Sequence, residues 1–255
     1  PQNHWTAYHI GNSDFVSADI GLVGAAYTGE FADMITVKGE FSYLFGRGDW
    51  ENIGYSDDVR FSGYNLYLDA SYHNDLLRVG AAFVTGSGQQ DSMEGANHFN
   101  VNFITADEFV FGNIIASGNG GMMDAFGGGL GFCDDIENLT AAKLYFEIYP
   151  LCCDGKLSLN AAVIWARWTE HVGVNTPYDH PVDYYLGNTY TSWYGSKTQL
   201  GWEIDFGLNY EIMEGLTYQL YTGVLFTGES YDYNSTGHQE WGPMWTVNNV
   251  LVYEF

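Results

Sequence analysis

The sequence is poor in basic residues and has no long apolar run, and each scarcity excludes a class of protein. It contains 8 Lys and Arg against 32 Asp and Glu, which gives a formal net charge of −24. So acidic a chain argues against nucleic acid or an anionic lipid surface as a partner. No run of 18 apolar residues occurs in the sequence, which excludes a transmembrane helix.

Cysteine is also scarce, and its arrangement does not suggest a metal site. Cys133 stands alone and Cys152 is followed directly by Cys153. A thiolate metal site needs spaced cysteines with histidine partners, and this sequence shows no such spacing.

Aromatic residues and glycine, in contrast, are abundant. The chain has 20 Tyr, 16 Phe, 8 Trp and 32 Gly, while charged residues reach only 16%. Aromatic residues favour strands, and rings gather at the two interfaces of membrane β-barrels. The composition therefore fits strands that face lipid.

The clearest pattern lies in residues 199–212, QLGWEIDFGLNYEI. Side chains alternate between the two faces of a strand, so this segment has one apolar face and one face with three carboxylates, Glu203, Asp205 and Glu211. The alternation lasts roughly 13 residues, longer than the usual globular strand of about 5–6 and long enough to cross a bilayer. We predict that the apolar positions face lipid: Leu200, Trp202, Ile204, Phe206, Leu208 and Tyr210 here, and Tyr253 near the end of the chain.

Similar alternation recurs along the whole chain. It is found in Phe15–Thr28, Ile35–Phe45, Gly63–Tyr72, Leu77–Thr85, Leu139–Tyr149, Lys156–Thr169, Leu216–Thr227 and Trp245–Phe255. The sequence therefore predicts an all-β protein, a transmembrane antiparallel up-and-down β-barrel forming one domain over residues 1–255.

The predicted connections alternate in length. Those at 29–34, 73–76, 150–155 and 213–215 are short, and those at 46–59, 86–137, 170–198 and 228–244 are long. Outer-membrane barrels have short periplasmic turns and long extracellular loops. This topology places Cys133 outside and the other two cysteines at a periplasmic turn, so we expect no disulfide between them.

The number of predicted strands is odd, whereas bacterial single-chain barrels have even numbers. We expect the chain to be the C-terminal portion of a larger barrel. The alternative is a complete ten-stranded barrel, with Trp5–Ile10, Phe99–Ile104 or Glu108–Ile115 supplying a further strand.

Several stretches resemble a known family. NLTAAKLYFEIYP (138–150), KLSLNAAVIWARWTE (156–170) and GWEIDFGLNYEIMEGLTYQLYTGVLFTGE (201–229), with the final Phe255, are similar to the last strands of alginate-export-like outer-membrane porins. The resemblance covers roughly residues 14–255 and implies a monomeric barrel with about twice as many strands. It also implies that Phe255 is the signal read by the barrel-assembly machinery. The chain departs from the alginate exporter because it lacks an arginine-rich lumen.

If the apolar positions face lipid, charged residues of the other parity line the lumen. The acids are Asp19, Glu40, Asp69, Glu147, Glu203, Asp205, Glu211 and Glu254, and the bases are Lys38, Arg78 and Lys143. Charges on a pore wall select the sign of the permeant ion. We therefore predict a cation-preferring porin for small hydrophilic solutes, located in the bacterial outer membrane.

Other features of the sequence suggest ligands only weakly. Asp57, Asp58, Asp134 and Asp135 lie in acidic loops where structural Ca²⁺ is an option, and no other cofactor is expected. The spacing of Glu203 and Asp205 would suit a glycosidase pair, but no supporting element accompanies it, so we predict no enzyme activity. The glycine-rich stretch 118–131 lies in the segment 86–137, which we expect to be an extracellular or pore-constricting loop.

Two other interpretations remain open. In the first, the barrel is closed and acts as a scaffold or sheath for a partner protein. In the second, the chain is a soluble β-sandwich binding module. Bilayer conductance separates the first from a channel, and behaviour without detergent separates the second.

Overall fold

The structure is a computed structural model. It describes residues 14–52, 55–88, 98–99, 111–115, 139–151, 155–169, 198–229 and 242–254. The three cysteines, the glycine-rich stretch 118–131, Asp134, Asp135 and Phe255 lie outside the described residues.

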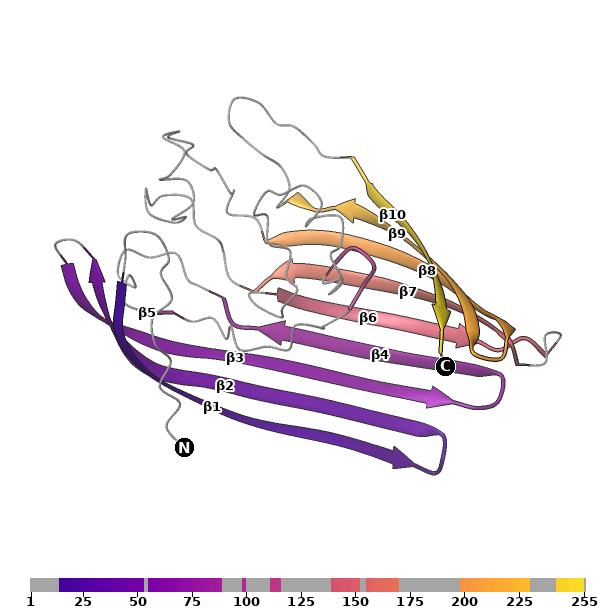
Figure 1. Ribbon diagram of the computed structural model, residues 1–255, viewed down its shortest axis with the longest axis horizontal. Helices are drawn as coiled ribbons and strands as arrows, with labels where there is room; N and C mark the ends of the chain where they lie inside the picture. The colour runs from indigo at the N-terminus through magenta and orange to yellow at the C-terminus, as the bar shows by residue number, and fades with distance from the viewer. Residues whose placement is uncertain are drawn as a thin grey trace.

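Nine strands follow one another in chain order in a single antiparallel sheet (Figure 1). They are β1 (Asp14–Phe31), β2 (Ile35–Asn52), β3 (Tyr55–His73), β4 (Leu77–Gly86), β6 (Leu139–Ile148), β7 (Leu157–Trp168), β8 (Gln199–Met213), β9 (Leu216–Thr227) and β10 (Met244–Tyr253). The short β5 (His98–Phe99) pairs in parallel with β3. The predicted all-β class and up-and-down order are confirmed.

Short turns join the strands at one end of the sheet. Ala32 and Asp33 both have positive φ, 52° and 54°, and link β1 to β2. With Met34 they form a three-residue connection between the paired Phe31 and Ile35, and left-handed residues at such a turn match the twist of the two strands. In the β3–β4 turn, the Asn74 side chain accepts bonds from the amides of Leu76 and Leu77 at 2.9 and 3.0 Å.

The β2–β3 hairpin differs from the prediction. Residues 46–59 were expected to form a long loop, but β2 and β3 pair continuously until Asn52 faces Tyr55. Asp57 and Asp58 therefore belong to β3, and Asp58 pairs with Asp49. The charged residues interrupt the apolar alternation, but the backbone ladder continues because each strand supplies the other's hydrogen bonds. The predicted alternation of short and long connections is wrong at this position.

The register gives the sheet two unlike faces. Opposite residues in an antiparallel ladder share a face, so the face of Glu203 also carries Ile164, Lys143, Ala82 and Asp69. We call this the inner face. The other, or outer, face carries large exposed apolar side chains, including Leu68, Leu144, Phe146, Val163, Trp202 and Phe206.

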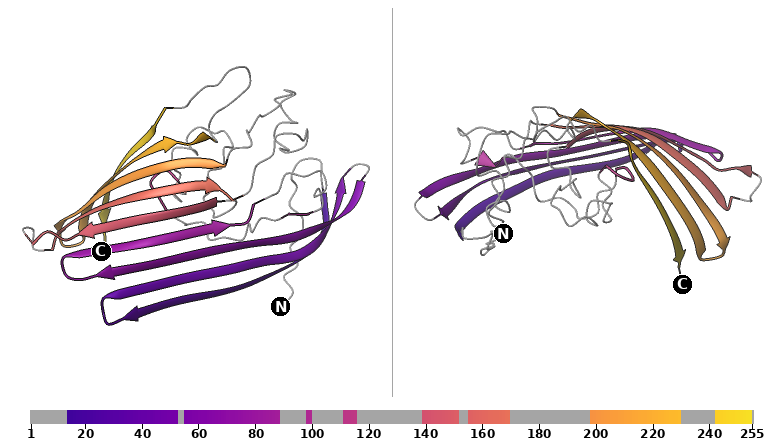
Figure 2. Two further views of the ribbon diagram at one scale, coloured as in Figure 1. Left: turned by 180° about the vertical axis from the view of Figure 1, so that it is seen from behind. Right: turned by 90° about the horizontal axis from the view of Figure 1, so that it is seen from above.

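The sheet is strongly curved, and the segment Phe111–Ile115 lies on its concave side (Figure 2). Its Phe111 and Ile115 pack in a buried cluster on the inner face with apolar residues of the wall: Ala82, Val84, Leu139, Ala141, Ile164, Ala166, Leu200 and Leu225. The concave face is therefore the inner face. No helix in the described part of the chain is long and apolar enough to cross a membrane.

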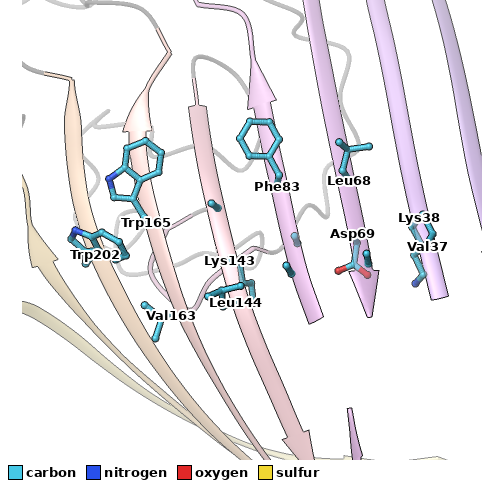
Figure 3. A pocket seen from close by; sticks show the side chains of 14 residues that line it. Val37, Lys38, Leu68, Asp69, Phe83, Lys143, Leu144, Val163, Trp165 and Trp202 are labelled. Carbon is cyan, nitrogen blue, oxygen red and sulfur yellow. The ribbon is translucent and has the colours of Figure 1, made fainter. Parts of the chain in front are cut away.

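The outer face has a hollow where the strands carry small side chains (Figure 3). Ala70, Ala81 and Ala142 of β3, β4 and β6 contribute to its lining, together with larger residues such as Phe83, Leu144, Trp165 and Trp202. Lys38, Asp69 and Lys143 also border the hollow, although the register assigns them to the inner face. The other residues that line the hollow are all apolar.

Candidate functional site

The candidate site centres on two carboxylates of β8. Glu203 is fully buried and Asp205 is 6% exposed. Both belong to the inner face, because they are two residues apart on one strand. Neither faces open water in this structure, because the segment Phe111–Ile115 lies over them.

Backbone amides of that segment donate to the two carboxylates. Ile114 N donates to Glu203 Oε1 at 2.7 Å, and Ile115 N donates to Glu203 Oε2 at 2.8 Å. Asn113 N donates to Asp205 Oδ2 at 3.2 Å. Hydrogen bonds to an ionised acceptor are stronger than neutral ones. The acid pair therefore acts as a clamp on the segment, and we call this arrangement the acid clamp.

Two further contacts hold the same segment to other strands. The Asn113 side chain donates to the carbonyl of Thr222 on β9 at 3.1 Å. Lys143 on β6 donates to the carbonyl of Phe111 at 2.6 Å. Strands β6, β8 and β9 thus all hold the five described residues of the segment.

Small residues make room for the segment. A Cβ on Gly112 would lie 2.8 Å from both Glu203 Oε2 and Ile164 Cδ1. A Cβ on Gly223 would lie 2.7 Å from Asp205 Oδ1 and 3.1 Å from Asn113 Cβ. A side chain at either glycine would displace the segment or the acids.

We expect Gly112→Ala to loosen the segment. The added methyl group has no space, so the substitution should lower the free energy of unfolding by about 1–3 kcal/mol, as overpacked sites do. Gly242→Ala is the matched control, because nothing lies within 4 Å of its Cβ position. Urea unfolding in detergent micelles measures both, and equal stability of the two variants would contradict the tight fit at Gly112.

A second polar group joins β3 to β6 on the inner face. Tyr145 donates its hydroxyl to Asp69, with distances of 2.8 and 3.1 Å to the two carboxylate oxygens. The Tyr145 ring passes over Gly80 of β4, whose Cβ would lie 2.5 Å from it. The Arg78 guanidinium lies 5.6 Å from the centre of the same ring and donates to Ser71 at 3.3 Å.

The structure places most predicted lumen residues on the inner face. Lys38, Glu40, Asp69, Arg78, Lys143, Glu147 and Glu211 share the face of Glu203. Asp19 does not. It pairs with Arg47 on the outer parity, whereas Leu22 pairs with the inner Leu44. Apolar residues occur on both faces of β1, so the alternation in the sequence did not identify the face of Asp19 correctly, and the prediction that it lines the lumen is wrong.

The predicted lipid-facing residues lie on the outer face, with one exception. Trp202 and Phe206 are 54% and 56% exposed, and Tyr210 and Tyr253 are exposed as well. Ile204 and Leu208 are half-buried on the same face. Leu200 is only 1% exposed and packs in the inner cluster. The register shifts there, since Ala166 pairs with Gly201 and Arg167 with Gln199. Leu200 is the extra residue of a β-bulge, which turns it away from lipid.

No metal site is found in the described part of the chain. No group of three or more His, Cys, Asp or Glu side chains is placed there to hold an ion. Of the proposed Ca²⁺ ligands, Asp57 and Asp58 lie on β3 and the other two fall outside the described residues. Bound Ca²⁺ stays a prediction.

The sequence did not predict that the segment Phe111–Ile115 lies over Glu203 and Asp205 on the inner face. The pattern predicted carboxylates facing an open lumen, but contacts between Glu203 and Ile115 join residues 88 positions apart. A signal was present in the inner parity, where Ala141, Ala162, Ala166 and Gly223 are small at neighbouring positions. Small residues on a curved wall leave space for another part of the chain.

Comparisons with known proteins find distant structural similarity. No protein-family model and no curated protein sequence matches the chain. Its structure is similar to a doubly substituted OccD1 (OprD), with 14% identity, a TM-score of 0.47, and coverage of 96% of this chain and 58% of the other. It is also similar to OccK11 (OpdR) of Pseudomonas aeruginosa, with 11% identity, a TM-score of 0.44, and coverage of 97% of this chain and 55% of the other. A third similar structure is OccK3 (OpdO) of the same organism, with 13% identity, a TM-score of 0.37, and coverage of 98% of this chain and 60% of the other.

The chain thus spans less than two thirds of the length of each of these three structures. Similarity at this distance does not assign the chain to a family. The resemblance to alginate-export-like porins stays a prediction.

Proposed function

We propose that this sheet is part of the wall of a channel in the bacterial outer membrane, through which small hydrophilic solutes diffuse passively. The observation that carries the proposal is the division of one curved sheet into an apolar outer face and an inner face with charged and polar groups. Water on the inner side and lipid on the outer side would satisfy both faces. The proposed role is not enzymatic.

The exposed apolar side chains support lipid on the outer side. Leu144 is 67% exposed, and its neighbours Phe146 and Val163 are exposed as well. A soluble monomer rarely exposes an apolar patch larger than a few hundred Å². The outer face instead continues from β2 to β10 with little interruption, as a membrane-spanning wall requires.

The sheet needs further strands to close. Within the described residues, β1 and β10 are its two edges. Because nine strands alternate in direction, β1 and β10 run the same way, so they cannot pair antiparallel with each other. Unpaired backbone groups are too costly in lipid to remain at a sheet edge. We therefore propose that an odd number of additional strands completes the barrel, which agrees with the expectation of a larger barrel.

The segment Phe111–Ile115 would narrow the channel. It lies on the concave side of the sheet and is held there by the acid clamp (Figure 2). This geometry supports a constriction at Phe111–Ile115, which lies within the segment 86–137 that the sequence predicts to be a loop.

The accessible inner face supports a preference for cations. Glu203 and Asp205 are buried, so they do not meet a passing ion directly. Glu40 is exposed, and Glu147 and Glu211 are half-buried on the same face. The bases Lys38 and Arg78 oppose them. Carboxylates along a pore raise the local concentration of cations and repel anions.

Planar bilayers test this proposal. Under a KCl gradient, we expect a reversal potential of the sign given by potassium permeation. Glu40→Gln combined with Glu211→Gln should reduce it, because both acids face the lumen. Thr36→Gln is the control, since it alters the same face without removing charge. An anion-selective potential in the unsubstituted protein would refute the cation preference.

A closed scaffold barrel is the second candidate. It is favoured by the position of Phe111–Ile115 across the inner face, where the segment obstructs part of the concave side. The same bilayers distinguish the two functions, because an obstructed barrel that binds a partner would insert without conducting.

A further inference from the structure

The oxygen atoms of the acid clamp are not equally satisfied. Both oxygens of Glu203 accept a backbone amide, and Asp205 Oδ2 accepts a third. Asp205 Oδ1 is buried, and no donor within the described part of the chain reaches it. A buried carboxylate oxygen without a donor is costly, because it has lost its bonds to water.

The unsatisfied oxygen lies beside the other carboxylate. Asp205 Oδ1 is 2.7 Å, and Glu203 Oε1 is 3.2 Å, from the point where a Cβ on Gly223 would stand. Both oxygens therefore lie beside Gly223, where there is no room for a side chain. Two carboxylates so close together disfavour a charge on both.

We propose that Asp205 and Glu203 hold one proton between them, carried on Asp205 Oδ1 and donated to Glu203 Oε1. The proton turns Asp205 Oδ1 into a donor, so this oxygen gains Glu203 Oε1 as its hydrogen-bond partner. Asp205 is assigned as its carrier because Glu203 takes two short amide bonds, which favour the charged form of the acceptor. Glu203 then carries the only negative charge of the pair.

The surrounding charges agree with one proton. Lys143 of β6 is a base on the same face as the pair, because it pairs with Ile164, which pairs with Glu203. One negative charge on Glu203 and one positive charge on Lys143 leave the acid clamp neutral in its apolar surroundings. The inner face also carries titratable groups on every neighbouring strand: Glu30 on β1, Lys38 and Glu40 on β2, Tyr67, Asp69 and His73 on β3, Arg78 on β4, Tyr145 and Glu147 on β6, Glu211 on β8 and Tyr221 on β9. The segment 111–115 has none.

The assignment predicts opposite responses to two amide substitutions. In Asp205→Asn, the amide can donate to Glu203 Oε1 and its oxygen can accept from Asn113 N, so the clamp is preserved. In Glu203→Gln, the side-chain NH₂ group replaces one carboxylate oxygen and faces the backbone N–H of Ile114 or Ile115. Two donors then face each other, and one hydrogen bond is lost. We expect the unfolding midpoint in detergent to change by less than about 2 °C in Asp205→Asn and to fall by about 4 °C or more in Glu203→Gln.

Infrared spectroscopy tests the proton directly. At neutral pH we expect a carbonyl band of a protonated carboxyl group that shifts in heavy water and is absent from Asp205→Asn. Raising the pH should remove this band from the unsubstituted protein. Absence of the band at neutral pH would overturn the proposal. So would destabilisation of Asp205→Asn equal to that of Glu203→Gln, or a reversed order of the two.

The inference rests on the proposed function only in its consequence for conductance. Loss of the proton adds a second charge beside Glu203, which should weaken the clamp, so a channel would conduct more as the pH rises. Asp205→Asn should abolish that rise, even though Lys143 and the tyrosines still titrate. The infrared and unfolding measurements need no channel, so they can fail or succeed independently of conduction.

Discussion

Val37→Arg is expected to lower the free energy of unfolding from lipid vesicles by about 1–2 kcal/mol, because Val37 is the third residue of β2 and an arginine on the lipid face costs less near the interface than at the bilayer midplane. Val37 pairs with Ala70 on the outer face and contributes to the lining of the hollow there. An arginine at this position would have to leave the hydrocarbon or carry water into it.

Thr36→Arg is the matched control for this substitution. Threonine and valine have nearly the same shape, and Thr36 is adjacent in β2, so its depth differs by only about 3.3 Å. It pairs with Ser71 on the inner face and with Glu30 of β1. An arginine there would reach water or the Glu30 carboxylate, and we expect a change below about 1 kcal/mol.

Equal tolerance of arginine at residues 36 and 37 would contradict the assignment of the outer face to lipid. It would mean that both positions have access to water. Guanidinium titration with tryptophan fluorescence provides the measurement, since the chain has 8 Trp.

The strands could be predicted from the sequence because alternation is a local property. The prediction for residues 216–227 agrees with the bounds of β9, and those for 77–85 and 199–212 are each one residue short of β4 and β8. A face that is apolar at every second residue allows only one orientation of the strand. Such a pattern needs no knowledge of the neighbouring strands.

The errors arose where a neighbouring strand decides the structure. β2 and β3 continue through Asp49 and Asp58 because they pair with each other, although neither strand is amphipathic there. Leu200 turns inward because of a bulge opposite Ala166 and Arg167. The acid clamp depends on a segment about 90 residues away in the chain, which alternation cannot detect.

Lys143→Met is expected to be the most damaging single substitution on the inner face. Lys143 pairs with Ile164, which pairs with Glu203 on the same face, and it donates to the carbonyl of Phe111 at 2.6 Å. Methionine keeps most of the side-chain volume but removes the positive charge and the donor. Removing one partner of a buried charged group costs about 3–5 kcal/mol, because the other charge stays buried without compensation.

The control for this substitution is Lys38→Met. Lys38 is exposed on the same face, so losing its charge should cost less than about 1 kcal/mol. Urea unfolding at several pH values measures both variants. The penalty of Lys143→Met should shrink as the pH falls, because protonation of Glu203 removes the uncompensated charge. A penalty that does not vary with pH would mean that Lys143 stabilises the segment through its bond to Phe111 alone, rather than by neutralising the acids.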